Sequence, residues 1–331
     1  MGFLSVGLFV GLFVGLSVAL AFGLRHWLLH RPAERRYVEP FDGVVYEVGE
    51  AAVAERRCDA PRATVVAVHG FVEDMRYFTH FYGDPDVQLV ALTSCGYHVA
   101  VDGPRRERPA WARPPAAPPG SIEYDAAVLV QALEHLPRSP HVRVHGHSRG
   151  GAVVLEAAAM RPDLFARVEV LLEAPVLSGA RFYRAPRALE IWLLAFALPL
   201  WRRRPISRQN RGAFGPLDRP RKRELIEGLP FSAKRAATMV ANLHSMAHWM
   251  RTRDASVYEH VARGTVLVPE LDRVLDAPSM LESARRAGPR LEIVRLRASS
   301  HFPLLDSPET FPAFAPPAAA AASPRHEPAS S

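Results

Sequence analysis

Apolar and polar residues divide the chain into an N-terminal stretch without charges, a long mixed region, and an end rich in alanine and proline. Short aliphatic runs in the mixed region predict strands. These runs are residues 63–68, 140–145, 168–172, 265–268 and 291–296. A segment of strong helix formers over residues 152–160, closed by an Arg-Pro pair, predicts a helix. We therefore predict an α/β fold with a mostly parallel sheet and flanking helices.

A serine stands between glycines where the strand at 140–145 gives way to the helix at 152–160. The segment reads Gly-His-Ser-Arg-Gly-Gly from Gly146 to Gly151, which is the sequence form of a nucleophile elbow. Such a turn is so tight that a side chain at either flanking position would collide with neighbouring backbone, and the serine must hold a strained conformation. We predict that Ser148 is a nucleophile.

A serine hydroxyl becomes a nucleophile when a histidine removes its proton and an acid orients that histidine. Asp272 follows the strand predicted at 265–268, and His301 follows the strand at 291–296. Both lie just beyond the carboxyl end of a strand, where open α/β sheets gather functional groups. Glu173, after the strand at 168–172, is an alternative acid.

Stabilising a developing oxyanion requires backbone N–H groups aimed at one point. The strand at 63–68 ends in His69-Gly70-Phe71, where glycine lets the chain turn beneath a substrate carbonyl. We assign the two donors to the N–H groups of Phe71 and Arg149.

In this order of motifs the chain resembles the α/β-hydrolase superfamily over residues 41–314. The resemblance implies a triad of Ser148, Asp272 and His301, a mostly parallel sheet of about eight strands, and no cofactor. It implies no particular substrate. The sequence departs from the family's pattern at residues 105–120, where proline and arginine replace a shorter turn. This segment either shapes the pocket rim or forms an insertion.

About ninety residues separate the strand at 168–172 from the strand at 265–268, which is too many for a bare loop. We expect a helical cap over residues 176–262. Its apolar segment at 189–201 is either a buried cap helix or an interfacial segment whose following arginines meet lipid phosphates. His244 and His248 lie one helical turn apart, but no third ligand is evident, so we predict no metal.

The charge-free stretch at residues 2–24 is long enough to cross a bilayer as a helix. We expect a retained single-pass anchor over residues 1–24 and a juxtamembrane linker over 25–40; a cleaved signal peptide is the alternative. Arginines after residue 24 place the catalytic domain in the cytoplasm by the positive-inside rule. Gly7, Gly11 and Gly15 share one helix face and predict a homodimer.

The net charge and the cysteine content limit the classes of partner that we expect this chain to bind. The formal net charge is +7, and arginine carries nearly all of it because Lys222 and Lys234 are the only lysines. Clusters of arginine suit an anionic membrane face, and nothing indicates nucleic-acid recognition. Cys58 and Cys95 form no short-spaced redox or metal motif. Residues 315–331 read as a disordered tail.

These residues predict a membrane-anchored serine hydrolase that cleaves a carboxylic ester or thioester, small or lipid-like, through an acyl-enzyme on Ser148. Two alternatives stay open at this point. One is a non-catalytic binding or scaffold protein on the same fold. The other is a cofactor-free perhydrolase, since such enzymes share the triad.

Overall fold

The computed structural model describes residues 2–32, 38–97, 99–103, 105–203, 208–229 and 232–314. The predicted tail at 315–331 and residues 33–37 of the predicted linker therefore lie outside the described residues. The strands of the large sheet are β2 (Val44–Val48), β3 (Ala51–Arg56), β4 (Ala63–Val68), β5 (Val87–Thr93), β7 (Arg105–Glu107), β8 (Val142–His147), β9 (Glu169–Glu173), β10 (Gly264–Pro269) and β11 (Leu291–Leu296). The described residues thus form a nine-stranded sheet in the order β11-β10-β9-β8-β4-β5-β3-β2-β7.

The sheet is mostly parallel, as predicted. Strands β11, β10, β9, β8, β4 and β5 pair in parallel, whereas β3 runs antiparallel to both β5 and β2. All five predicted strands are present, and β11 has the predicted bounds, whereas β4 ends at Val68, before the His-Gly pair in which we expected it to end. Strands β4, β5 and β10 are mainly apolar and buried along nearly their whole length, as expected for parallel strands covered on both faces.

The sheet has one strand more than the eight expected. The segment at 105–120 supplies β7, a short edge strand that pairs in parallel with β2. Beyond it, Trp111 packs on Tyr46 and stacks on His135, with ring centroids 5.4 and 5.3 Å apart. The proline- and arginine-rich segment therefore closes an edge of the sheet with β7, and its last residue, Gly120, returns toward the site, where its carbonyl accepts from the Arg149 guanidinium at 3.3 Å.

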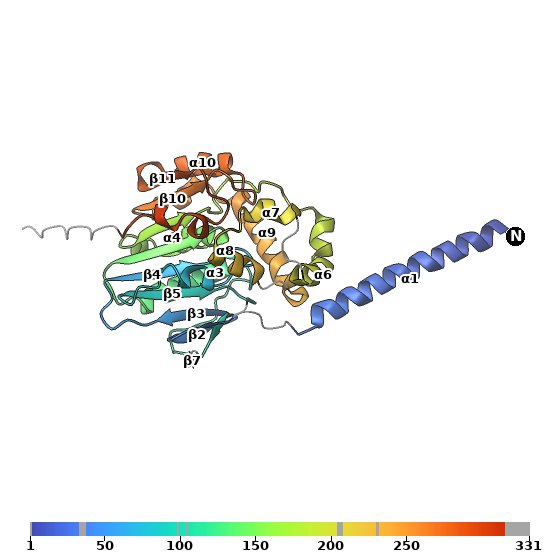
Figure 1. Ribbon diagram of the computed structural model, residues 1–331, viewed down its shortest axis with the longest axis horizontal. Coiled ribbons are helices and arrows are strands. Elements are labelled where there is room, and N and C mark those ends of the chain that lie inside the picture. Colours follow the sequence, from blue (N-terminus) through green and yellow to red (C-terminus); the bar gives the residue numbers. More distant parts are fainter. Residues whose placement is uncertain are drawn as a thin grey trace, which may run out of the picture.

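Helices cover both faces of the sheet (Figure 1). Outside the cap they are α2 (Arg76–Thr79), α3 (Ile122–His135), α4 (Arg149–Met160), α5 (Pro162–Phe165), α10 (Ala277–Arg285) and α11 (Pro303–Asp306). Ser121 begins α3 as its N-cap, and its Oγ accepts a hydrogen bond from the Tyr124 N–H at 3.0 Å.

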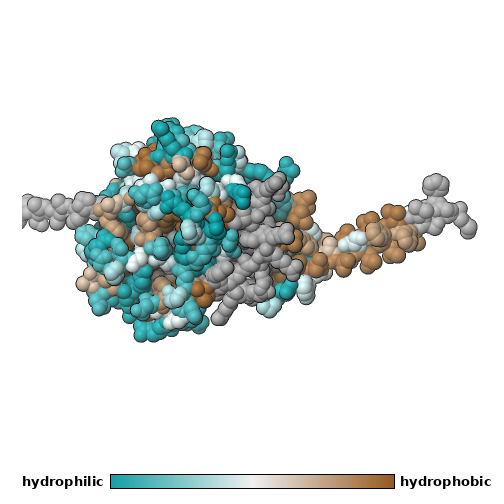
Figure 2. Space-filling view, viewed as in Figure 1, coloured by the Kyte–Doolittle hydropathy of each residue, from teal (hydrophilic) through white to brown (hydrophobic). Residues whose placement is uncertain are grey.

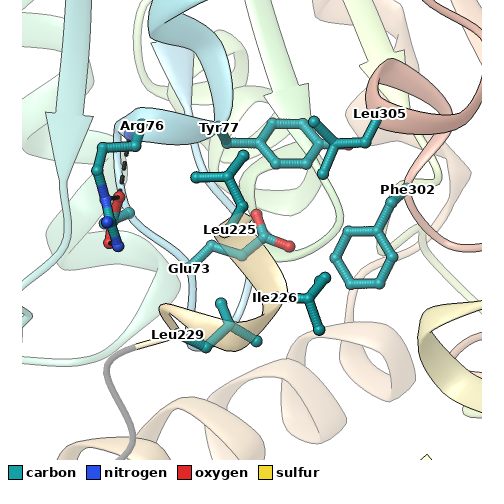
Figure 3. Close-up of a pocket in the computed structure, with 9 residues that line it drawn as sticks. Glu73, Arg76, Tyr77, Leu225, Ile226, Leu229, Phe302 and Leu305 are labelled. Atoms are coloured by element: carbon teal, nitrogen blue, oxygen red, sulfur yellow. Dashed lines mark hydrogen bonds and ion pairs between the residues drawn. The ribbon is translucent and has the colours of Figure 1, made fainter. Parts of the chain in front are cut away.

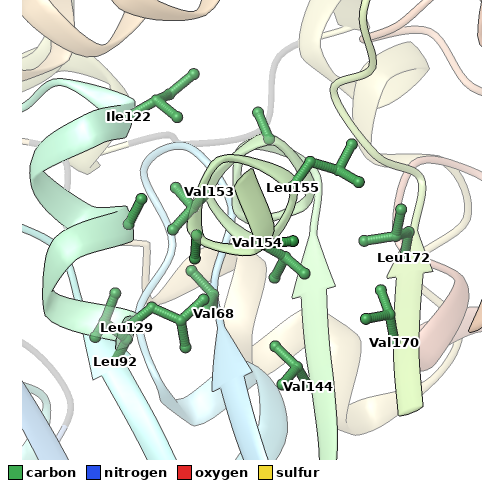
Figure 4. Close-up of a cluster of buried hydrophobic side chains, with 14 of the residues drawn as sticks. Val68, Leu92, Ile122, Leu129, Val144, Val153, Val154, Leu155, Val170 and Leu172 are labelled. Atoms are coloured by element: carbon green, nitrogen blue, oxygen red, sulfur yellow. The ribbon is translucent and has the colours of Figure 1, made fainter. Parts of the chain in front are cut away.

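The main core lies between the central strands and helices α3 and α4 (Figure 4). Val68, Val144 and Val170 project from neighbouring strands toward Val153 and Val154 of α4, and all five are fully buried. Burial of this kind contributes about 1.5–3 kcal/mol for each large aliphatic side chain. It fixes α4, and with it the residue that precedes α4, against the sheet.

The segment between β9 and β10, where we predicted a cap, is largely helical. It contains α6 (Ala188–Arg203), α7 (Arg208–Phe214), α8 (Pro220–Glu227), η1 (Ala233–Arg235) and α9 (Ala236–Thr252). Its last helix is tied to the core because Trp249 Nε1 donates a hydrogen bond to Glu156 Oε2 at 2.9 Å. His244 and His248 are exposed on α9. The apolar segment at 189–201 forms most of α6.

Helix α1 (Gly2–His30) projects from the domain, and its apolar surface is the brown rod in Figure 2. It is the one helix among the described residues that is both long enough and apolar enough to cross a membrane. The predicted anchor ended at residue 24, but the helix continues to His30. Near its end Phe22 meets Trp192 of α6 edge-on, with centroids 5.7 Å apart, and Arg25 Nε donates to the Trp192 carbonyl at 3.4 Å.

Candidate active site

Four parallel strands end at the same edge of the sheet, and each is followed by one of the predicted functional groups. Gly70 and Phe71 follow β4, and Ser148 follows β8 directly. Asp272 follows β10, and His301 lies in the loop after β11. Strand β8 pairs with β4 on one side, whereas β9 and β10 connect it to β11 on the other. Residues far apart in sequence therefore meet at one place.

The turn from β8 to α4 has the strained geometry that the glycine pattern predicts. Ser148 has φ 51° and ψ −116°, a positive φ that residues with a side chain rarely adopt. A Cβ on Gly146 would lie 2.6 Å from the Gly150 carbonyl oxygen, and a Cβ on Gly150 would lie 2.2 Å from the carbonyl oxygen of Val68. Neither clash can be relieved by moving a side chain, so both positions require glycine.

Ser148, His301 and Asp272 form one hydrogen-bonded chain. His301 Nε2 lies 2.9 Å from Ser148 Oγ, and His301 Nδ1 lies 2.7 Å from Asp272 Oδ2. The other carboxylate oxygen of Asp272 accepts hydrogen bonds from the N–H groups of Val274 and Leu275, at 2.7 and 2.9 Å. Asp272 is thereby held in one orientation, and it fixes Nδ1–H as the side of the imidazole that donates. The ring nitrogen that faces Ser148 is then free to accept a proton.

The alternative acid, Glu173, is bonded to other groups. Its Oε1 accepts hydrogen bonds from Tyr77 Oη and the Leu304 N–H, both at 2.6 Å, and its Oε2 lies 3.0 Å from His145 Nε2. These hydrogen bonds occupy both oxygens of the Glu173 carboxylate. Asp272 occupies the position beside His301 Nδ1. Glu173 therefore holds the loop after His301 in place through the Leu304 N–H and does not orient the imidazole.

The two predicted oxyanion donors belong to segments next to Ser148, the start of α4 and the turn after β4. Arg149 is the first residue of α4, so its N–H belongs to the first turn, whose amides have no partner within the helix. Phe71 follows Gly70, and a Cβ on Gly70 would lie 2.9 Å from Ser148 Cβ. The β4 turn thus approaches the serine closely. The next amide, of Val72, donates to Tyr97 Oη at 3.0 Å and fixes the turn.

Three buried charged residues around these groups were missed in the sequence. Asp125 of α3 pairs with the Arg149 guanidinium, Glu73 accepts from the Gly70 N–H at 2.8 Å, and Lys222 of α8 donates to Ser300 Oγ at 3.1 Å and pairs with Asp306. Burial lowers the pKa of Lys222, and Asp306 partly opposes this. Glu73, Asp125 and Lys222 bond partners that lie 74, 24 and 84 residues away, so no local pattern marked them.

A cavity of about 10 Å³, room for a water molecule, lies between α2, α8 and the loop around α11, with the buried Asp74–Arg76 ion pair at its side (Figure 3). Its walls are Tyr77, Leu225, Ile226, Leu229, Phe302 and Leu305, and they surround the Glu73 side chain. Tyr77 and Leu305 also line a neighbouring cavity of about 280 Å³, which Arg219 and Arg221 border. Ser148, His301 and Asp272 are 4%, 3% and 3% exposed, so the cap closes the site in this conformation.

The comparisons with known proteins agree with this geometry. The family model described as "Alpha/beta hydrolase family" matches residues 65–313, well over half of the chain. Over 120 residues the chain is 31% identical to Lipase LipV of Mycobacterium tuberculosis, an overlap of 36% of this chain and 40% of that protein. The matched part thus spans about two fifths of the length of this relative.

Solved structures show the same fold at low identity. An esterase from Exiguobacterium antarcticum has a TM-score of 0.58 at 12% identity, covering 81% of this chain and 96% of the esterase. The 2-hydroxy-6-oxo-6-phenylhexa-2,4-dienoate hydrolase of a Rhodococcus species has a TM-score of 0.57 at 18% identity, covering 80% and 93%. The family match and these relatives support a hydrolytic enzyme. The chain belongs to the alpha/beta hydrolase family.

Proposed function

We propose that this protein is a membrane-anchored serine hydrolase that cleaves a carboxylic ester or thioester through an acyl-enzyme on Ser148. The observation that carries the proposal is the chain of hydrogen bonds from Ser148 Oγ to His301 and on to Asp272, at 2.9 and 2.7 Å. A nucleophile, a base and an orienting acid in this geometry perform acyl transfer on unrelated folds.

Two steps of acyl transfer follow from these positions. His301 Nε2 takes the hydroxyl proton while Ser148 Oγ forms a bond to the carbonyl carbon, and Asp272 stabilises the imidazolium. The Phe71 and Arg149 N–H groups hold the oxyanion. When the C–O or C–S bond breaks, His301 gives the proton to the leaving alcohol or thiol. Water then attacks the acyl-enzyme by the reverse sequence, releasing the acid and restoring the Ser148 hydroxyl.

Apolar side chains of the cap close to His301 favour an acyl group of apolar character. Leu225, Ile226 and Leu229 of the cap face Phe302, the residue directly after His301. Small-molecule sites of this kind recognise their ligands mainly through apolar walls with few polar groups. The printed names of the relatives, a lipase and an esterase, point in the same direction. We infer a lipid-like carboxylic ester as the preferred substrate class.

Membrane attachment is supported by the length and composition of α1. Its leucine and phenylalanine side chains from Leu8 to Phe22 are all more than half exposed, including Phe22, which contacts Trp192. The guanidinium carbon of Arg31 lies 4.7 Å from the centroid of the Trp27 ring, and both residue types are common at membrane surfaces. We propose a retained single-pass anchor with the catalytic domain in the cytoplasm, and a homodimer through the face that carries Gly7, Gly11 and Gly15.

Labelling with a fluorophosphonate probe tests the catalytic proposal. The wild-type chain should be labelled, and Ser148→Ala should not. A wild-type chain that folds but resists the probe would favour the non-catalytic alternative. Peracid formation from acetate and hydrogen peroxide, measured beside ester hydrolysis, separates the perhydrolase alternative.

The orientation in the membrane is tested with a C-terminal reporter in spheroplasts. Protection of the reporter from external protease supports the cytoplasmic placement, and rapid digestion contradicts it.

A further inference from the structure

His147, the residue before Ser148, is completely buried and bonded at both ring nitrogens. Its Nδ1 lies 2.8 Å from Glu73 Oε2, and its Nε2 lies 2.8 Å from the main-chain carbonyl oxygen of His301. Tyr77 stacks on the ring, with centroids 4.4 Å apart and an angle of 13° between the planes. The side chain thus connects the nucleophile turn directly to the backbone of the residue that faces Ser148.

The two acceptors determine the charge of His147. A carbonyl oxygen accepts only, and the ionised Glu73 carboxylate, which already accepts from the Gly70 N–H at the same oxygen, accepts only. Both ring nitrogens must therefore carry a proton. A doubly protonated imidazole is a cation, so His147 and Glu73 form a buried ion pair with strong, charge-assisted hydrogen bonds.

Charged neighbours on every packed side favour this protonation state. Burial alone would lower the pKa of His147, but the charges of Glu73 and Glu173 and the bonds to Glu73 and His301 raise it to about 9. His145 and the His301 ring, whose centroid is 5.1 Å away, also face it. Burial lowers the pKa of His145, which keeps that neighbour uncharged at neutral pH.

The ion pair holds three separate parts of the site in register. Glu73 fixes Gly70 in the β4 turn that precedes Phe71, His147 is part of the β8 elbow, and the His301 carbonyl belongs to the loop after β11. We propose that protonated His147, together with Glu73, is a positioning pair that sets the His301 imidazole and the Phe71 N–H relative to Ser148. This inference rests on the proposed serine hydrolase function.

The position of the pair predicts a particular pH dependence. When His147 loses its proton, one of its two hydrogen bonds must break, and the β11 loop and the β4 turn become free to shift relative to Ser148. Displacements near one ångström in such groups cost about a hundredfold in rate. Activity should therefore fall above pH about 9. Because His147 is completely buried and the cavity beside Glu73 holds only about 10 Å³, neither side chain is placed to touch the substrate, so the loss should appear in kcat more than in KM.

The test compares Glu73→Gln with wild type, using the full chain in nanodiscs and a soluble p-nitrophenyl ester from pH 6 to pH 10. Hydrolysis by Ser148→Ala supplies the blank. We expect Glu73→Gln to lower kcat at pH 8 about tenfold to a hundredfold with KM changed less than about threefold, and to move the alkaline limb down by at least one pH unit. The control is Glu156→Gln, another buried carboxylate, which bonds Trp249 and Arg253 on the far side of α4.

The outcomes are separable. An alkaline limb at the same pH in wild type and Glu73→Gln overturns the positioning pair while leaving the hydrolase proposal intact. Absence of fluorophosphonate labelling in wild type overturns the hydrolase proposal itself. If Glu73→Gln does not fold, the ring nitrogens of His147 in 15N-histidine-labelled wild type decide: two protonated nitrogens at pH 7.5 support the pair, and one protonated nitrogen contradicts it.

Discussion

The Asp125 carboxylate of α3 and the Arg149 guanidinium of α4 form an ion pair that is at most 1% exposed. Arg149 also donates to the Ser121 carbonyl at 2.9 Å. This pair anchors the first residue of α4, whose N–H is one proposed oxyanion donor, to the N-terminus of α3. The Arg149 side chain is therefore structural, and its backbone is the part assigned to chemistry.

Asp125→Asn should destabilise the fold markedly. The substitution leaves a buried guanidinium without its counter-charge, and removing one partner of such a pair costs about 3–5 kcal/mol. Chemical unfolding of the full chain in detergent measures the loss. Asp163→Asn is the control because Asp163 pairs with Arg161 at the surface. Equal stability of Asp125→Asn and wild type would contradict this role of the pair.

Gly150→Ala should prevent folding or abolish activity. The new Cβ would lie 2.2 Å from the Val68 carbonyl oxygen, and the backbone of β4 cannot move without displacing the sheet. Gly212→Ala in α7 is the matched control, since its Cβ would meet nothing within 4 Å. We expect soluble, labelled protein from the control only. A folded and fully active Gly150→Ala enzyme would show that the elbow tolerates a side chain.

Asp272→Asn should lower kcat by about three to four orders of magnitude, because the amide no longer stabilises the imidazolium or fixes its tautomer. Glu173→Gln should cost far less, since Glu173 bonds Tyr77, His145 and the Leu304 N–H instead of the His301 ring. Steady-state kinetics on one soluble ester compare the two. A larger loss in Glu173→Gln than in Asp272→Asn would exchange the roles of the two acids.

Thermal stability should decrease as the pH rises through about 9, because His147 is protonated in the folded protein. Its folded pKa is raised above the unfolded value, so the stabilisation is complete below pH about 6.5 and is lost as the pH passes the folded pKa. Melting temperatures from pH 6 to pH 10 measure the trend. The decrease should be smaller in Glu73→Gln, and an equal decrease would assign it to other groups.

The exposed face of α6 should contact lipid. Leu189, Leu193 and Leu200 are 66%, 41% and 66% exposed, and α6 packs on α1 where the apolar helix reaches Arg25. A fluorophore on Leu193→Cys in a Cys58→Ser background should shift to the blue in nanodiscs and be quenched by spin-labelled lipid. Met160→Cys, 40% exposed at the end of α4, is the control. Identical spectra at the two sites would contradict lipid contact.

Local patterns in the sequence predicted the elements that hold the site. The glycines around Ser148 are required by collisions within a few residues of the turn. The aliphatic runs before Phe71 and Asp272 form buried strands, whereas the run before His301 forms the edge strand β11, in which Glu292 and Arg295 are exposed. Such causes are visible in short segments. The bounds of β11 were therefore predicted to the residue.

Features that depend on distant partners were not predictable. Strand β7 exists because β2 offers it an edge, and the three residues of β7 carry no apolar alternation. Helix α1 continues past residue 24, where its last turns contact α6. Glu73 and Asp125 were missed because their partners lie 74 and 24 residues away. No short window of sequence contains such pairs.

Detection of the acyl-enzyme tests the central claim most directly. The full chain in nanodiscs is mixed with an excess of a slowly hydrolysed ester, quenched in acid within the first turnover, digested and analysed by mass spectrometry. We predict that the peptide containing Ser148 gains the mass of the acyl group and that Ser148→Ala gains none. An acyl group on another residue, or turnover of the ester with Ser148 never modified, would contradict the account.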